Sequence, residues 1–149
     1  MPASIELAEG ILAVHCTPSD DSAFLTEEIH QDRLIPASRH QVRERLGAAI
    51  SRAIVLCGHS HRQSLTQMPG GSLIMNPGSV GCPVFADILR ANCIELRSPH
   101  ARYAILTRHG DRWSAEFFAL EYDWDKAAIR ARDNGFADWA EALVTGAVT

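Results

Sequence analysis

Two histidines, His59 and His61, stand one residue apart in the sequence Gly-His-Ser-His at residues 58–61. The five residues before this segment are apolar, which predicts a buried strand that ends at Gly58. Side chains at positions i and i+2 point to the same side of an extended backbone, so both imidazoles can reach one small target. Neutral imidazole is the commonest metal ligand among side chains. The segment therefore predicts a metal site, although a His-x-His pair alone is more often surface or capping chemistry.

A third histidine, His15, follows the apolar residues 11–14, which predict a second strand. Its position after that strand is the same as the position of His59 after the other. In open α/β sheets, ligands bind in the crevice at the carboxyl ends of the strands. We therefore add His15 to His59 and His61 as a candidate metal ligand.

A glycine-rich segment, residues 76–81 (Asn-Pro-Gly-Ser-Val-Gly), follows the mostly apolar residues 72–75. Proline fixes φ, and the glycines allow positive φ and close approach of another backbone. Taken alone, this segment is a turn, and we interpret it as structural, packing against the histidine loop. The Gly78 and Ser79 amides could also meet an anion, so Asn76, Gly78 and Ser79 are the candidates for substrate contact.

The combination of residues 58–61 with residues 76–81, each after a predicted strand, resembles the carboxyl-terminal signature of the calcineurin-like metallophosphoesterases. The resemblance is greatest to the small bacterial and archaeal phosphodiesterase branch. Residues 14–18 (Val-His-Cys-Thr-Pro) also match this family, except that Cys16 stands where a glycine is usual. The resemblance runs from about Gly10 to Gly146. It implies an α/β fold, half of the metallophosphoesterase sandwich, in which a mixed sheet has helices on the outside and residues 1–149 form a single domain.

The family hydrolyses phosphoric esters with two divalent cations, which lower the pKa of a bridging water and hold the ester in line for attack. By the resemblance, His15 and His59 share one metal ion and His61 binds the other, and the implied cofactors are manganese, zinc, nickel or iron. The expected ligand of the whole site is a phosphate ester or a phosphate ion. Three nitrogen ligands without a carboxylate fit one borderline ion such as zinc or nickel better than a pair.

The family also carries an Asp-x-His motif, a Gly-Asp motif and a Gly-Asn-His-Asp/Glu motif in its amino-terminal half. We find none of these in place here, since Gly110-Asp111 belongs to a late predicted hairpin. We therefore expect the chain to resemble the carboxyl-terminal half only, and to hydrolyse phosphodiesters poorly or not at all alone. A half-sandwich exposes a sheet edge or face, so we expect a homodimer or a partner chain that buries the strands near residues 11–15 or 53–57.

Two alternatives remain open beside the phosphoesterase half. One is a pseudoenzyme that keeps the fold and binds a metal, a phosphate or a protein partner. The other is an unrelated His-x-His metal-binding module. An upstream reading frame that encodes the missing motifs would favour the phosphoesterase half, and a self-associating chain without one would favour the pseudoenzyme.

Composition narrows the function classes further. A chain of 149 residues predicts one domain, and a net charge of −4 argues against a general nucleic-acid binder. The four cysteines show no Cys-x-x-Cys spacing, so neither a zinc ribbon nor a disulfide framework is indicated. No run approaches the ~18 apolar residues of a membrane span, and no leader is recognisable, so we expect a cytoplasmic protein without membrane association.

Periodicity and capping residues predict the remaining elements. We expect a strand at residues 4–7, and an antiparallel hairpin at residues 101–106 and 113–120. The expected helices are residues 22–30, residues 38–52 capped by Ser38, residues 123–134 capped by Asp123, and residues 136–144.

Overall fold

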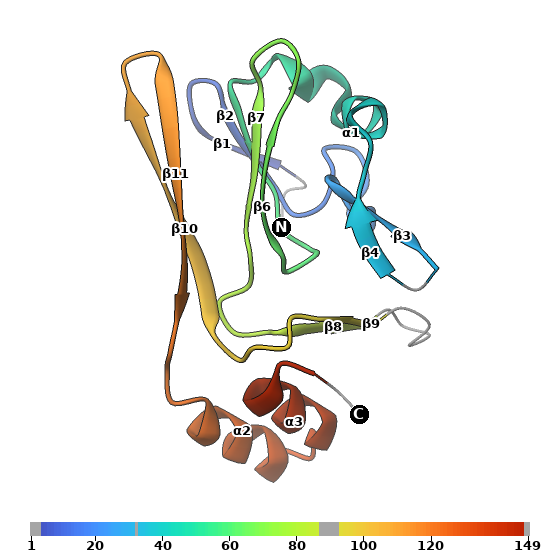
Figure 1. The fold of residues 1–149 in the computed structure, drawn as a ribbon, viewed down its shortest axis with the longest axis vertical. Coiled ribbons are helices and arrows are strands. Elements are labelled where there is room, and N and C mark those ends of the chain that lie inside the picture. The colour runs from blue at the N-terminus through green and yellow to red at the C-terminus, as the bar shows by residue number, and fades with distance from the viewer. Residues whose placement is uncertain (1–3, 32, 87–92, 148–149) are drawn as a thin grey trace. The chain divides into compact units, whose positions relative to one another are not determined.

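The computed structural model describes residues 4–31, 33–86 and 93–147 (Figure 1). The chain divides into two compact units, Met1–Pro77 and Gly78–Thr149, and each is described by itself. The expectation of a single domain stays a prediction.

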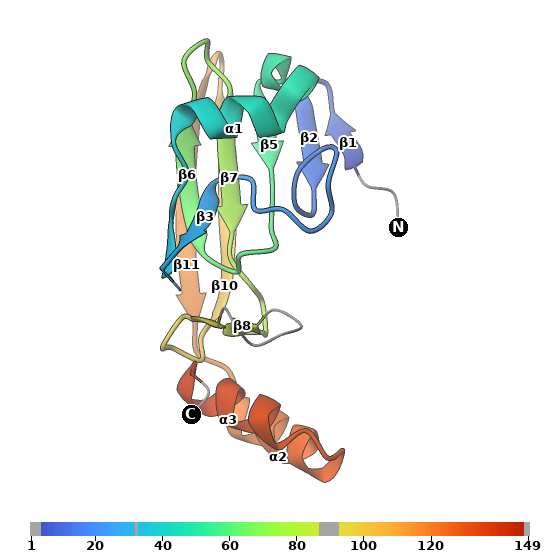
Figure 2. The ribbon, with the colours of Figure 1, turned by 90° about the vertical axis from the view of Figure 1, so that its right-hand side faces the viewer.

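A five-stranded mixed sheet forms the centre of the first unit, with strand order β1-β2-β5-β7-β6 (Figure 2). Three strands at the middle of the sheet run parallel, and an antiparallel strand flanks them on each side. The strands are β1 (Ser4–Ala8), β2 (Ile11–Val14), β5 (Ile54–Leu56), β6 (Gln63–Gln67) and β7 (Leu73–Pro77). This mixed sheet, together with the helices, confirms the predicted α/β class.

The parallel strands β5 and β7 are almost wholly buried, as continuous apolar runs predict for strands covered on both faces. Ile54, Val55 and Ile74 are each 0% exposed. Burial of each such side chain stabilises the fold by about 1.5–3 kcal/mol. Because β2 and β5 have neighbours on both sides, the exposed edges of this sheet are β1 and β6. Residues 11–15 and 53–57 thus belong to inner strands of the sheet, and their burial by a homodimer or a partner chain stays a prediction.

Helix α1 (Arg39–Leu46) packs on this sheet through Val42 and Leu46, which are buried in the core with Val55 and Ile74 (Figure 2). Ser38 begins the helix as predicted, because its side chain accepts from the Gln41 N–H and the Gln41 side chain accepts from the Ser38 N–H. This capping box satisfies two backbone donors that the first turn leaves open. Gly47 has φ 51° and ends the α-helix, and a short 3-10 helix, η1 (Gly47–Ser51), follows it.

Residues 22–30 do not form the predicted helix. The structure has a loop followed by β3 (Glu27–His30), which pairs antiparallel with β4 (Arg33–Pro36). The helix was predicted from the spacing of Leu25 and Ile29, but Leu25 is 2% and Ile29 39% exposed, so the two do not form one buried face. A guanidinium nitrogen of Arg45 donates to the Glu27 carbonyl at 2.7 Å, so a distant side chain supports the extended conformation.

The described residues of the second unit contain two antiparallel strand pairs and a pair of helices. Its elements are β8 (Val84–Ala86), β9 (Cys93–Glu95), β10 (Ala101–His109), β11 (Arg112–Leu120), α2 (Trp124–Asp133) and α3 (Ala137–Thr145). The antiparallel β10–β11 hairpin and both helices confirm the sequence predictions, including the Asp123 cap, whose carboxylate accepts from the Lys126 N–H. Ala128, Ala140 and Leu143 join the two helices in a small apolar core. Among the described residues, no helix is both long and apolar enough to cross a membrane.

Candidate metal centre

The carboxyl ends of β2, β5 and β7 lie at one edge of the sheet, because these strands are parallel. Backbone pairing continues past the strand ends. The Gly58 N–H donates to the His15 carbonyl at 2.9 Å, and the Cys57 N–H donates to the Met75 carbonyl at 2.9 Å. The first of these bonds holds the His15 backbone directly beside the loop that carries His59. Regular hydrogen bonding between neighbouring parallel strands therefore brings the His15 backbone and the His59 loop together.

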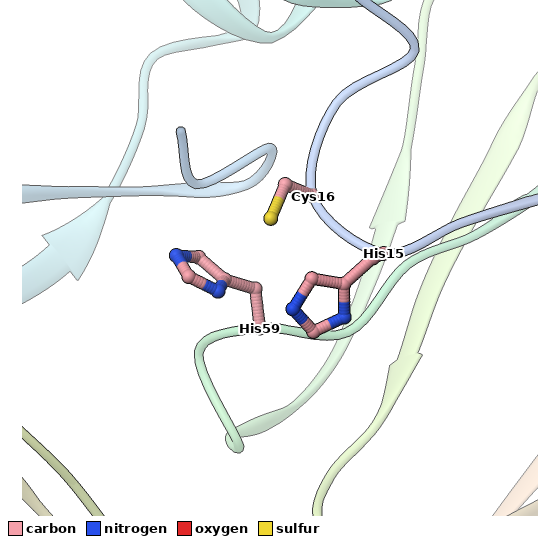
Figure 3. Close-up of side chains that lie close together, drawn as sticks. All are labelled: His15, Cys16 and His59. Atoms are coloured by element: carbon pink, nitrogen blue, oxygen red, sulfur yellow. The ribbon is translucent and has the colours of Figure 1, made fainter. Parts of the chain in front are cut away.

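Three side chains gather at this edge: His15, Cys16 and His59 (Figure 3). Each can place one ligand atom so that all three atoms lie within 4.8 Å of one another. The two imidazole rings are 5.1 Å apart between centroids and meet edge to face at 75°. His15 is exposed and His59 half-buried, whereas Cys16 is only 1% exposed. The two histidine side chains are therefore accessible to solvent, whereas the thiol is shielded from it.

The ring of His59 is fixed from its other side. Its Nε2 atom lies 3.1 Å from the Ser22 carbonyl oxygen, and the ring packs against Phe24 at 4.9 Å between centroids. A carbonyl oxygen can only accept, so we assign the hydrogen to Nε2, which makes Nδ1 the acceptor nitrogen of the neutral ring. Burial, and the charge of His15, lower the pKa of His59. The neutral form, which binds metals, therefore predominates near neutral pH.

The Cys16 thiol donates to the Asp21 carbonyl at 2.7 Å within the loop that follows β2. Burial and the nearby carboxylates of Asp21 and Asp20 raise the pKa of this thiol to about 11. Asp20 accepts hydrogen bonds from the side chain and backbone N–H of Ser22, which lower the pKa of Asp20. Two negative charges therefore lie next to the cluster, on the loop that also supplies the Ser22 carbonyl to His59.

The backbone at residues 58–61 is not extended, contrary to the premise of the His-x-His argument. His59 has φ 67° and His61 has φ 59°, both left-handed, and the Ser60 N–H bonds to the Gly58 carbonyl at 2.8 Å. His61 consequently lies outside the group of ligand atoms that includes His15, Cys16 and His59. A metal ion on His61 stays a prediction.

A buried polar layer supports this loop from beneath. Asn76 and Ser60 are both 0% exposed, and the Asn76 amide donates to the Gly58 carbonyl at 2.8 Å and to Ser60 Oγ at 3.0 Å. Glu27, 5% exposed, accepts from Thr26 Oγ1 at 2.8 Å and is also hydrogen-bonded to Ser60. Burial raises the pKa of Glu27, against the effect of these hydrogen bonds and of the Arg62 and Arg45 charges. Asn76 thus fits the interpretation of its segment as structural, and its contact with substrate stays a prediction.

Gly78 and Ser79 begin the second unit. Gly78 has φ 86°, which a turn at this point requires of glycine, and the Ser79 hydroxyl accepts from the Cys82 N–H at 3.0 Å. The Ser79 carbonyl accepts from the Arg102 N–H at 2.9 Å and joins the turn to the start of β10. These contacts describe a structural turn, and the anion contact proposed for both residues stays a prediction.

Sequence reasoning overlooked two residues of this site. Cys16 carried one signal, since it stands where the resembling family has glycine, but the sequence analysis did not include it among the candidate ligands. Glu27 carried none, because the segment was interpreted as a helix. Both take their place through contacts between segments far apart in the sequence.

The donor set determines which ions fit. Imidazole nitrogen suits zinc, copper, iron and nickel, and carboxylate oxygen suits magnesium, calcium and manganese. Within residues 4–31, 33–86 and 93–147, no carboxylate belongs to a metal-sized cluster with His15 and His59. The side chains present therefore fit one borderline divalent ion.

Comparison with solved structures identifies the fold of the chain. No protein-family model matches the chain, and no curated protein matches its sequence. A metallophosphoesterase from Sphaerobacter thermophilus superposes with a TM-score of 0.66 over 99% of this chain and 60% of that chain, at 17% identity. The chain described here has the fold of part of a metallophosphoesterase. A hypothetical protein from Pyrococcus horikoshii OT3 gives a TM-score of 0.67 over 100% of this chain and 52% of that one, at 14% identity. The chain therefore spans less than two thirds of both structures, and the predicted half of a metallophosphoesterase sandwich is confirmed as a fold.

Proposed function

We propose that residues 1–149 form the part of a metallophosphoesterase that contributes histidine ligands to its metal centre, and that the complete centre hydrolyses phosphoric esters. The observation that carries the proposal is the convergence of His15 and His59 at the carboxyl ends of parallel strands β2 and β5. The metallophosphoesterase fold of the chain supports the same function, because it places these histidines in a fold known to host that chemistry.

The residues of the chain divide this work between them. His15 and His59 bind the ion, and the Ser22 carbonyl fixes the ring and tautomer of His59, as partners of metal-binding histidines commonly do. Hydrogen bonds from Asn76 to the Gly58 carbonyl and to Ser60 Oγ hold the loop that carries His59 in place. A bound divalent ion would supply neutralisation of charge on the phosphoryl oxygens and activation of water.

We further propose that the chain is inactive or nearly so by itself. Two cations close together need carboxylates to offset their repulsion, and the described cluster offers only two imidazoles and a thiol. The completing carboxylates would come from a polypeptide segment outside residues 1–149. The exposed edge strand β1, with Ile5 48% and Leu7 58% exposed, is a surface that such a segment could cover.

The absence of a carboxylate from the described cluster also favours a second candidate, a pseudoenzyme that binds one metal ion or phosphate and acts through a protein partner. The two candidates differ in turnover, since only the first hydrolyses a phosphoric ester. A segment that restores phosphodiester hydrolysis when added in trans supports the first, and failure of every metallophosphoesterase amino-terminal segment to do so supports the second.

The test combines metal content with hydrolysis of bis(p-nitrophenyl) phosphate. Wild type, His15→Ala and His59→Ala are compared with His40→Ala, which removes an exposed histidine that pairs with Glu44 on α1. We expect wild type and His40→Ala to bind a divalent ion, both site variants to lose it, and no chain to turn over alone. Equal metal content in all four proteins would overturn the metal site. Turnover by wild type with manganese, abolished in His59→Ala, would overturn the claim that the chain is inactive alone.

A further inference from the structure

The cluster contains one side chain, Cys16, to which the proposed function assigns no role. The Cys16 sulfur lies on the same side as the two imidazoles, and Figure 3 shows it directed toward the space between the rings. It comes from the end of β2, next to His15, so the strand that places one ligand also places the thiol. At 1% exposure the sulfur is shielded from bulk oxidants while its neighbours remain accessible.

We infer that Cys16 is a third protein ligand, and that the cluster His15, Cys16 and His59 selects zinc or a zinc-like ion over manganese and magnesium. This inference rests on the proposed function, since it requires His15 and His59 to hold an ion. It goes beyond that function by specifying a sulfur ligand and the class of metal.

The geometry allows this coordination after a small adjustment. With Zn–N of about 2.0 Å and Zn–S of about 2.3 Å, the nitrogen and sulfur ligands of a tetrahedral ion lie about 3.3–3.5 Å apart. The three atoms already lie within 4.8 Å of one another, so closure needs about 1 Å of side-chain movement. Two nitrogens and one sulfur leave a fourth position open, as in zinc sites that also bind substrate or water.

The chemistry of sulfur decides the metal. Thiolate is a soft ligand that favours zinc, whereas manganese and magnesium favour oxygen. On binding, the thiol loses its proton to solvent and gives up its hydrogen bond to the Asp21 carbonyl, and a sulfur–metal bond replaces the S–H bond. The Asp20 and Asp21 carboxylates, whose charges act on both Cys16 and His59, add an attraction for a cation.

The competing explanation is that Cys16 only fastens its loop through the Asp21 carbonyl. Cys16→Ser separates the two roles, because a hydroxyl can still donate to that carbonyl but is a poor ligand for zinc. Cys57→Ala is the matched control, since it removes a second buried thiol from the same unit that lies outside the cluster.

The experiment is a titration with cobalt(II), a spectroscopic substitute for zinc, followed by competition with zinc and with manganese. We expect wild type and Cys57→Ala to show visible d–d bands together with a near-ultraviolet sulfur-to-cobalt charge-transfer band. Cys16→Ser should keep weakened d–d bands and lose the charge-transfer band. Its zinc affinity should fall by roughly 10- to 100-fold or more, while its affinity for manganese changes little.

Cobalt binding by wild type without the charge-transfer band, and with equal zinc affinity in Cys16→Ser, would overturn the inference and leave the proposed function standing. No cobalt or zinc binding by wild type would overturn both. Loss of the charge-transfer band in Cys57→Ala but not in Cys16→Ser would identify Cys57 as the sulfur ligand. This result would also overturn the inference.

Discussion

The Asn76 side-chain amide donates to the Ser60 hydroxyl at 3.0 Å, and both residues are completely buried. The same amide donates to the Gly58 carbonyl at 2.8 Å, so one side chain at the end of β7 binds both ends of the turn that precedes His61. This turn carries His59 in a left-handed conformation that a non-glycine residue rarely adopts. The buried amide therefore supports the conformation of the metal loop.

We expect Asn76→Ala to lower the free energy of unfolding by about 1–3 kcal/mol, because it leaves buried polar groups without their partner. We also expect zinc affinity to fall by roughly 10- to 100-fold through disorder of the loop. Urea unfolding and a zinc titration of the same samples measure both effects, and Asn134→Ala at the exposed C-cap of α2 is the control for loss of an asparagine amide. Lost stability with unchanged zinc affinity would show that Asn76 supports the fold and not the site.

Glu27 gives a prediction about pH. Burial raises its pKa above the ordinary value of 4.5, so the folded state takes up a proton at higher pH than the unfolded state. The resulting contribution to stability is complete below about pH 4.5 and is lost as pH rises through the folded pKa. Relative to Glu27→Gln, wild type should therefore lose stability as pH rises from about 4 to about 7.

Denaturant unfolding of both proteins across this pH range measures the difference. Glu44→Gln removes an exposed carboxylate and controls for net charge. A stability difference between wild type and Glu27→Gln that does not change with pH, or that changes in the opposite direction, would contradict the assignment of Glu27 as a buried, hard-to-ionise carboxyl.

His61 separates a one-ion site from a two-ion site. Because its side chain lies outside the cluster, we expect His61→Asn to retain the zinc affinity of wild type when the chain is studied alone. Asparagine is chosen because it tolerates the left-handed backbone at this position. Once a segment that restores turnover is added, the same variant should hold one ion fewer than wild type by elemental analysis. Loss of the first ion in His61→Asn alone would place His61 in the same site as His59.

Two glycines of the second unit form a matched pair. Gly146 and Gly135 both end helices in the left-handed region, with φ 75° and 84°. A Cβ on Gly146 would lie 2.8 Å from the Arg97 carbonyl carbon, whereas a Cβ on Gly135 meets nothing within 4 Å. We expect Gly135→Ala to cost about 1–2 kcal/mol from backbone conformation alone, and Gly146→Ala to cost more. Thermal unfolding of both variants measures this, and equal costs would contradict the close approach of Gly146 to Arg97.

Local signals in the sequence predicted much of this fold. Ser38 with Gln41 at the third helical position, and Asp123 before an amphipathic segment, mark helix starts that the structure confirms. The apolar runs at residues 53–57 and 72–75 give buried parallel strands, because a strand covered on both faces shows no alternation. Each of these signals lies within a few residues of the feature it predicts.

The rest depends on contacts across the chain. Strand β3 is extended because β4 and Arg45 provide its hydrogen-bond partners. The residue types at positions 22–30 do not predict these contacts. The left-handed backbone at His59 and His61 is held by Asn76 from another strand. Cys16 enters the cluster because β2 and β5 align in parallel register, with Ala13 opposite Leu56. Their positions after predicted strands made His15 and His59 candidates, whereas the spacing of His59 and His61 did not predict the cluster and Cys16 was not expected in it.

The central claim is that His15 and His59 together hold a metal ion, and calorimetric titration with zinc tests it most directly. The comparison is between wild type and the double variant His15→Ala/His59→Ala, with His40→Ala as the control for a surface histidine. We predict one zinc ion per chain for wild type and for His40→Ala, and no binding at the same concentrations for the double variant. Equal zinc binding by all three proteins, or none by wild type, would contradict the metal site and the function proposed from it.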